Sequence, residues 1–208
     1  MTSFIIWYVL SLILAVVNLP LTWRLFKALP SRGYALSRPV GLLLWGYLFW
    51  LLTSLQLLHN DLAGQLVAFG LVLVLNLLVL RGGRAKELWA WIKAHRRLIL
   101  TTEALFLVAF GLWAVVRAAN PAIIGTEKPM EMAFINAILR SPTFPPNDPW
   151  LSGYAISYYY FGYVLAAMLI RVSVVDAAIG YNLMSALWFA LTALGAYGVL
   201  FDLLAGNQ

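Results

Sequence analysis

The stretch LAGQLVAFGLVLVLNLLVL, residues 62–80, contains no charged side chain. A helix needs about 20 mostly apolar residues to cross the hydrocarbon core of a bilayer, so this stretch predicts a membrane-spanning helix. Five other stretches have similar length and composition. The six predicted spans are residues 4–26, 40–58, 62–80, 98–118, 154–172 and 177–204. Pro20 falls inside the first span, where it predicts a kink or the end of the regular helix.

The overall composition points to the same class of protein. Of the 208 residues, 63% are hydrophobic and 11% are charged, whereas a soluble domain carries about 25% charged residues. This excludes a disordered chain and an ordinary water-soluble fold. The sequence therefore predicts an all-α fold, a polytopic integral membrane bundle of about six transmembrane helices. Cysteine is absent and only His59 and His95 are present, which argues against thiolate or histidine metal centres.

The predicted architecture is a single transmembrane domain over residues 1–208. It comprises four helices over 4–118, a loop with a short helix over 119–153, and two helices over 154–208. Residues 84–97, RAKELWAWIKAHRR, place leucine, isoleucine and two tryptophans among basic residues. This pattern predicts an additional helix that lies in the cytoplasmic interface of the membrane.

The basic residues predict how the chain crosses the membrane. The fourteen of them lie in the gaps between apolar stretches or in the last turn of a predicted span, and with eight acidic residues they give a net charge of +6. This is a pattern of membrane topology rather than nucleic-acid binding. Eleven, among them Arg171, fall on one side, and only Arg117, Lys128 and Arg140 fall on the other. By the positive-inside rule the eleven are cytoplasmic. We therefore expect a multi-pass protein of the plasma membrane, in contact with lipid, with both termini and the loop 120–153 outside.

The external loop contains a predicted amphipathic helix with two carboxylates on its apolar face. Thr126 is a suitable N-cap, and the helix would run to about Arg140. One face carries Glu127, Glu131, Phe134 and Ile138. An acid on a buried-facing stripe needs a partner, or performs chemistry as a general base or a cation ligand. The alternative is that Lys128, Arg117 or Arg140 neutralises the glutamates.

A proline-rich segment follows this helix and ends in Asp148 and Trp150. Four prolines within eight residues make residues 142–149 stiff and non-helical. Asp148 either caps a turn through its side chain or faces the same cavity as the glutamates. Trp150 fits the interfacial aromatic belt, and a sugar ring could also stack on it.

Five tyrosines then cluster in residues 154–163, at the start of the fifth predicted span. They would cover every side of a helix, so some must point inward and need hydrogen-bond partners. Three of them are the consecutive Tyr158, Tyr159 and Tyr160. Gly162 and Ala166, one turn apart, predict close helix packing.

Few polar residues lie inside the predicted spans. Glu103 is an isolated intramembrane acid, which makes it a functional candidate by default. Three asparagines predict hydrogen bonds between helices; they are Asn18, Asn76 and Asn182.

Residues 125–163, GTEKPMEMAFINAILRSPTFPPNDPWLSGYAISYYYFGY, resemble the signature of the DUF2298 family of membrane proteins, whose domain is named for its YYY motif. The resemblance continues through DAAIGYNL, residues 176–183. Members of that family are longer, so these 208 residues would be either the N-terminal part of a longer protein or a truncated, non-catalytic relative. The family in turn resembles the GT-C superfamily of membrane glycosyltransferases.

The resemblance implies an enzyme that takes a sugar from a polyprenyl-phosphate carrier at the extracytoplasmic face. Glu127 or Glu131 would be the base, with Asp148 as a second acidic candidate. Lys128 or Arg117 would contact the carrier phosphate. The cavity would be lined by Tyr158, Tyr159 and Tyr160. The resemblance leaves a divalent metal open as a cofactor, and it assigns no metal ligand.

A second hypothesis is a non-catalytic membrane subunit that scaffolds or stabilises a larger membrane protein complex. It rests on the short chain and on aromatic helices with little polar interior. Its partners would be other membrane protein subunits, whereas the partners of the enzyme would be lipid-linked sugars.

Overall fold

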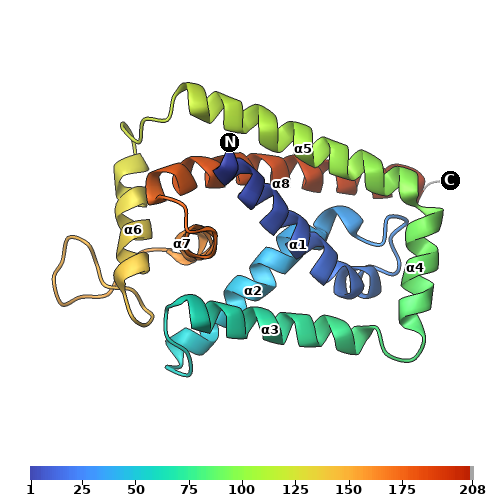
Figure 1. Ribbon diagram of the computed structural model, residues 1–208, viewed down its shortest axis with the longest axis horizontal. Coiled ribbons are helices and arrows are strands. Elements are labelled where there is room, and N and C mark those ends of the chain that lie inside the picture. Colours follow the sequence, from blue (N-terminus) through green and yellow to red (C-terminus); the bar gives the residue numbers. More distant parts are fainter. Residues whose placement is uncertain (207–208) are drawn as a thin grey trace.

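The computed structural model describes residues 1–206, which form helices joined by loops (Figure 1). The all-α prediction is confirmed, since this part of the chain contains no β-strand beyond one isolated bridge. The elements are α1 (Thr2–Leu25), the short 3-10 helix η1 (Tyr34–Leu36), α2 (Ser37–Ser54), α3 (Leu62–Val79), α4 (Arg84–Ala94), α5 (Arg96–Ala119), α6 (Lys128–Arg140), α7 (Phe161–Ser173) and α8 (Ala177–Ala205).

Five helical segments among the described residues are long and apolar enough to cross a membrane. They are Thr2–Leu25, Tyr34–Ser54, Leu62–Val79, Arg96–Ala119 and Ala177–Ala205. The fifth predicted span, 154–172, is wrong. Its helix, α7, has 13 residues and is about 20 Å long, whereas the hydrocarbon core is about 30 Å thick.

The fifth predicted span is shortened because its first residues fold back onto the proline-rich segment. The backbone N–H of Ile156 donates to the carbonyl of Pro146 at 2.9 Å, and that of Asp148 donates to the carbonyl of Tyr154 at 2.8 Å. These bonds satisfy backbone groups that a helix would otherwise have used. The helix therefore begins only at Phe161.

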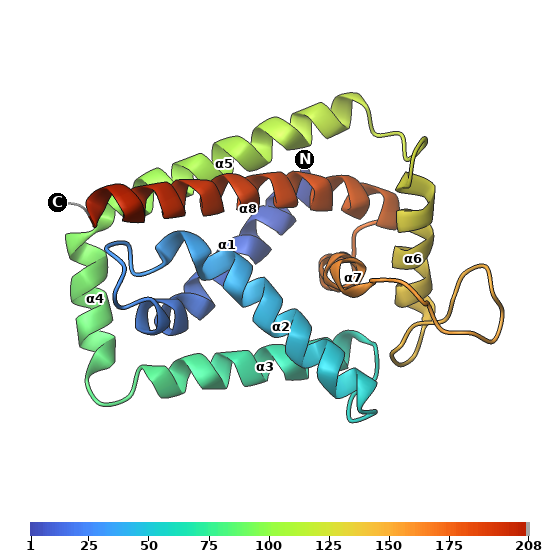
Figure 2. The same ribbon diagram turned by 180° about the vertical axis from the view of Figure 1, so that it is seen from behind.

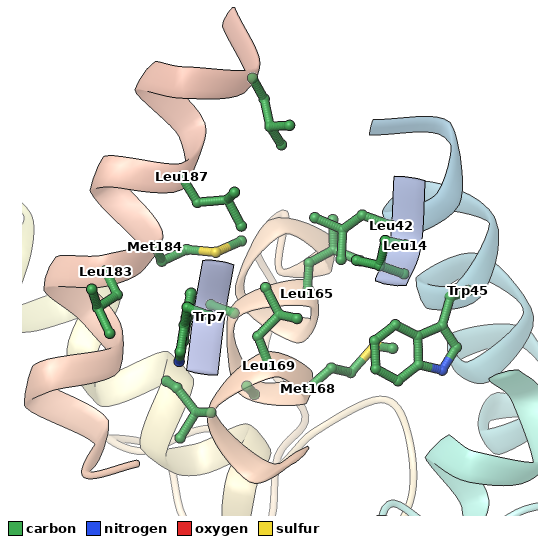
Figure 3. Close-up of a cluster of buried hydrophobic side chains, with 14 of the residues drawn as sticks. Trp7, Leu14, Leu42, Trp45, Leu165, Met168, Leu169, Leu183, Met184 and Leu187 are labelled. Atoms are coloured by element: carbon green, nitrogen blue, oxygen red, sulfur yellow. The ribbon is translucent and has the colours of Figure 1, made fainter. Parts of the chain in front are cut away.

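α7 lies across the interior of the bundle. Figures 1 and 2 show it end-on, while α5 and α8 run across the view. Its residues from Val164 to Ile170 are all buried, and it contacts α1, α2, α3, α6 and α8. Figure 3 shows Leu165, Met168 and Leu169 between two groups of side chains. Those of α8 and Trp7 of α1 lie on one side, and those of α2 and Leu14 of α1 lie on the other. A helix that is apolar all round is stable in such a position because every face is covered.

The bundle has two distinct ends, which we name the α4 end and the α6 end after the helix that runs across each (Figure 1). The helix predicted over residues 84–97 is found as α4, which buries Leu88 and Trp91. The α4 end also contains the loop between α1 and α2. There the backbone N–H and the hydroxyl of Ser31 donate to the carboxylate of Asp202, at 2.7 and 2.8 Å.

That contact and the five spans revise the predicted topology. Asp202 lies in the last turns of α8, so α8 ends beside the basic loops and not on the opposite side, where it was predicted. Arg171 was counted with the cytoplasmic basic residues, but it lies at the α6 end. Its guanidinium donates to the side-chain oxygen of Asn60 and to the carbonyl of Leu139, both at 2.8 Å.

Asparagine side chains join the spanning helices as predicted. The amide of Asn76 in α3 donates to the side-chain oxygen of Asn18 in α1 at 3.3 Å. The side-chain oxygen of Asn76 accepts the backbone N–H of Leu21 at 3.0 Å, one residue after Pro20. α1 therefore continues past the proline to Leu25, and the expected helix end at Pro20 is not found. Gly41 lets α2 approach closely, since a Cβ there would lie 2.4 Å from the amide nitrogen of Asn18.

Glu103 is not isolated, contrary to the prediction from sequence. It forms an ion pair with Arg38, whose side chain is 1% exposed, and it accepts the hydroxyl of Tyr34 at 2.8 Å. The guanidinium of Arg38 also lies over the ring of Phe106, 4.2 Å from its centroid. The two charges neutralise each other inside the apolar bundle and tie η1 and α2 to α5.

The position of the α7–α8 connection can be tested by cysteine labelling, because the natural chain has no cysteine. Val174 is 89% exposed in this connection. We expect Val174→Cys to react with a membrane-impermeant maleimide from the same side as Ser152→Cys. Lys86→Cys, in α4, should react only from the other side. Labelling of Val174→Cys from the same side as Lys86→Cys would contradict the five-span topology and support the six-span topology predicted from sequence.

The ion pair at the α4 end should contribute strongly to stability. Arg38→Met leaves the partly buried carboxylate of Glu103 without its partner, and we expect the free energy of unfolding to fall by about 3 kcal/mol. Adding Glu103→Leu removes the unpaired charge, so the double variant should recover most of the loss. Reversible unfolding in mixed micelles measures both values. A double variant as unstable as Arg38→Met alone would contradict this account.

Candidate functional site

A cavity of about 230 Å³ lies at the α6 end, between α6, α7 and α8. α6 contributes Glu131 and Ile135 to its wall, and α7 contributes Gly162, Tyr163 and Ala166. The remaining lining residues come from α8 and are Tyr181, Met184, Ser185 and Trp188. Most of the wall is apolar, and Glu131 carries the one acidic group among the lining residues.

Small residues at the start of α7 leave room for this cavity. A Cβ atom at Gly162 would meet no other atom within 4 Å, and Ala166 lies one turn further along the same wall. The sequence predicted that this pair allows close packing of two helices. Gly162 instead borders open space, so that prediction is wrong for this residue.

Glu131 is held in place by a tyrosine and not by a basic residue. The hydroxyl of Tyr181 donates to Oε2 of Glu131 at 2.5 Å. Among residues 1–206 the one ion pair is Arg38–Glu103, so the predicted neutralisation by Lys128, Arg117 or Arg140 is not found. Oε1 of Glu131 accepts no hydrogen bond from the described residues, and it remains able to accept one from a ligand in the cavity.

Glu127 lies at the N-terminus of α6, one turn before Glu131. It occupies the N-cap position and is exposed, so the prediction that both carboxylates lie on the buried stripe holds only for Glu131. The predicted N-cap, Thr126, instead has a positive φ of 49°. Burial raises the pKa of Tyr163, and the negative charges of Glu131 and Glu127 raise it further. The two glutamates therefore influence the same tyrosine.

An aromatic cluster covers the outer face of α6. The ring of Phe134 lies 5.4 Å from that of Trp150 and 5.6 Å from those of Tyr158 and Tyr163, measured between centroids. The cluster thereby brings Trp150 and the YYY motif, predicted separately from sequence, to one side of the same helix. Trp150 remains 59% exposed, so a ligand ring can reach it.

The YYY motif itself lines a second, aromatic cavity of about 290 Å³ against α2. Its walls are Tyr47, Trp50, Tyr158, Tyr159, Tyr160 and Phe161. The indole N–H of Trp50 donates to the hydroxyl of Tyr160 at 3.0 Å, and the hydroxyl of Tyr158 donates to that of Tyr159 at 2.5 Å. The motif therefore lines a cavity, but a different one from the cavity of Glu131.

The remaining predicted site residues lie outside the Glu131 cavity. Asp148 caps a turn, where its Oδ1 accepts the backbone N–H groups of Trp150 and Leu151 at 2.8 and 2.9 Å. Arg117 lines a separate cavity beside Asn182. Lys128 is half-buried in the first turn of α6, three residues before Glu131.

The acidic residues do not gather into a metal site. No group of three His, Asp or Glu side chains suited to a metal ion occurs within residues 1–206. The donor set that a divalent cation prefers, several oxygen ligands, is therefore not assembled by the described chain, and we derive no chemistry from a metal.

Sequence reasoning missed Tyr181, the residue that orients Glu131. It was noted only as part of the segment 176–183. A signal was available, because a tyrosine in the second turn of a predicted span lies near the membrane surface, where polar partners occur. Its pairing with Glu131, 50 residues earlier, depends on how α6 packs against α8.

These features define an all-helical multi-pass membrane protein with a carboxylate-lined cavity at one end. The model of a family of uncharacterised membrane proteins, DUF2298, matches residues 44–208, which is 165 of 208 residues. The chain belongs to this family, as its motifs indicated. Neither the curated proteins nor the solved structures contain a match.

The hydrogen bond within the YYY motif has a measurable consequence. Because Tyr158 donates to Tyr159, the pKa of Tyr158 rises to about 12. Tyr159→Phe removes the acceptor, so Tyr158 should lose its proton at lower pH, near the usual tyrosine pKa of about 10. Ring-carbon NMR of labelled tyrosine can follow the titration. Tyr154→Phe removes an exposed tyrosine nearby and should leave Tyr158 unchanged; an equal shift in both variants would contradict the assignment.

Proposed function

We propose that this protein is a membrane glycosyltransferase of GT-C type that uses a polyprenyl-phosphate-linked sugar. The observation that carries the proposal is the carboxylate of Glu131 on the wall of an otherwise largely apolar cavity. By the positive-inside rule, the basic residues of α4 support an orientation in which the α6 end lies outside the cytoplasm. The proposed reaction therefore takes place at the extracytoplasmic face of the plasma membrane.

In the proposed reaction Oε1 of Glu131 accepts the proton of an acceptor hydroxyl. The acceptor oxygen forms a bond to the anomeric carbon of the sugar as the bond from that carbon to the carrier phosphate breaks. The polyprenyl phosphate leaves with the electron pair of the broken bond, and the proton stays on Glu131 until it passes to water. The hydrogen bond from Tyr181 to Oε2 fixes the carboxylate so that one oxygen stays available.

Other residues at the α6 end suit the substrate. The ammonium group of Lys128, in the turn before Glu131, can bind the carrier phosphate. The rings of Trp150 and Tyr158, which share Phe134 as a neighbour, offer faces on which a sugar can stack. Glu127 is the second candidate base, because its charge acts on Tyr163 in the cavity wall.

The alternative proposal is a non-catalytic subunit of a larger membrane complex. It is supported by the apolar surface of α3, on which most large side chains are exposed. Another membrane protein could pack there, and lipid tails would cover the same surface equally well. This role would not require the carboxylate of Glu131.

Replacing the proposed base separates the two functions. Glu131→Gln removes the proton acceptor and keeps the shape of the side chain, so transfer should slow about 100-fold or more. Cells carrying this variant should accumulate a polyprenyl-phosphate sugar, measured by mass spectrometry of extracted membrane lipids. Glu87→Gln, an exposed glutamate of α4, is the matched control and should leave the lipid-linked sugar at the wild-type level.

A cavity-filling variant tests the same site without changing its charge. Gly162→Leu adds a side chain whose Cβ would meet no other atom within 4 Å and which extends into the cavity, so the protein should fold and the substrate should be excluded. Cells carrying Gly162→Leu should accumulate as much polyprenyl-phosphate sugar as cells carrying Glu131→Gln. If the level of lipid-linked sugar is unchanged in both variants while the protein is present at normal levels, the glycosyltransferase proposal is wrong and the non-catalytic subunit remains.

A further inference from the structure

A third cavity lies at the α6 end, bounded by the start of α1, the end of α5 and the start of α8. It has a volume of about 310 Å³. Phe4, Ile179 and Leu183 contribute apolar walls, and Ser3, Arg117 and Asn182 contribute polar groups. It shares no lining residue with the cavity of Glu131.

The guanidinium of Arg117 is held rigidly by Asn182. Its Nε and Nη2 donate to the side-chain oxygen of Asn182 at 2.8 and 2.5 Å. The amide nitrogen of Asn182 donates in turn to the carbonyls of Pro121 and Ala178 at 3.1 and 2.9 Å. A side chain fixed in this way loses little further freedom when it binds a ligand.

Arg117 lacks a counter-charge. Its Nη1 makes no hydrogen bond with residues 1–206, and the ion pair of the described chain is elsewhere, between Arg38 and Glu103. The side chain is half-buried near the end of a spanning helix. A partly desolvated charge is costly unless an opposite charge accompanies it, so this site is suited to an anion.

We propose that this cavity binds the anionic headgroup of a membrane phospholipid, with its phosphate against Nη1 of Arg117. Guanidinium groups bind phosphate by charge-assisted hydrogen bonds, and the hydroxyl of Ser3 can donate another. The apolar walls suit the first part of an acyl chain, which a free phosphate ion lacks. This site goes beyond the proposed glycosyl transfer, because it lies on another face of α8 and does not involve Glu131.

Lipid retention tests the assignment. The full chain is placed in nanodiscs of phosphatidylcholine with a small fraction of phosphatidylglycerol, released into detergent, and examined by native mass spectrometry. The wild type should keep one phosphatidylglycerol, and Arg117→Gln should lower its retention about tenfold or more, as expected for loss of a charged hydrogen bond. Arg140→Gln is the matched control, since Arg140 is an exposed arginine of the same end, and it should retain the lipid.

Two further variants test whether phosphatidylglycerol binds in this cavity. Ala118→Trp fills the cavity and leaves Arg117 in place, so it should also lose the lipid even if Arg117→Gln fails to fold. Glu131→Gln should retain the lipid, which separates this site from the proposed function. The proposal is overturned if Ala118→Trp retains phosphatidylglycerol like the wild type, or if inorganic phosphate displaces the lipid and so identifies a free-phosphate site.

Discussion

The packing of α7 inside the bundle is the constraint on which the α6 end depends. This helix crosses between the longer helices, which together with α6 bury its residues from Val164 to Ile170. Its last turns are tied at two places, since Trp7 donates to Ser173 at 3.0 Å and Arg171 donates to Asn60 and to the carbonyl of Leu139. Arg171 thereby satisfies a carbonyl near the end of α6, where helical carbonyls lack partners of their own. The position of α6, and with it that of Glu131, follows from these contacts.

Polar groups inside the bundle follow one physical rule, which is that each charge needs a partner where water is scarce. Arg38 and Glu103 meet this need through each other, and Asn18 and Asn76 meet it through hydrogen bonds between helices. Arg171 and Arg117 have only neutral partners, and Arg117 lines a cavity. The combination of a charge without a counter-charge, a free Nη1 and an adjoining cavity is the reason for assigning a ligand to Arg117.

The first turns of α8 separate two environments at the α6 end. Tyr181 faces the cavity of Glu131, whereas its neighbour Asn182 faces the cavity of Arg117. Consecutive residues of a helix point about 100° apart, so one helix can serve two sites. A lipid held beside α8 would therefore contact the helix that orients the carboxylate, and would support it without entering the reaction cavity.

The sequence by itself determined the class of protein and most of its helices. Composition and span length predicted the all-helical membrane fold, because burial in lipid imposes length and polarity on each spanning segment alone. Amphipathic patterns predicted the helices α4 and α6. We predicted a helix over residues 154–160 because their aromatic side chains suit a membrane helix. In the structure this segment is not helical, because it forms tertiary hydrogen bonds with the proline-rich segment. The pairing of Glu131 with Tyr181, the ion pair of Glu103, and the separation of Arg117 from the glutamates were likewise decided by tertiary structure. Each depends on the crossing of helices far apart in sequence, and local patterns carry no information about such crossings.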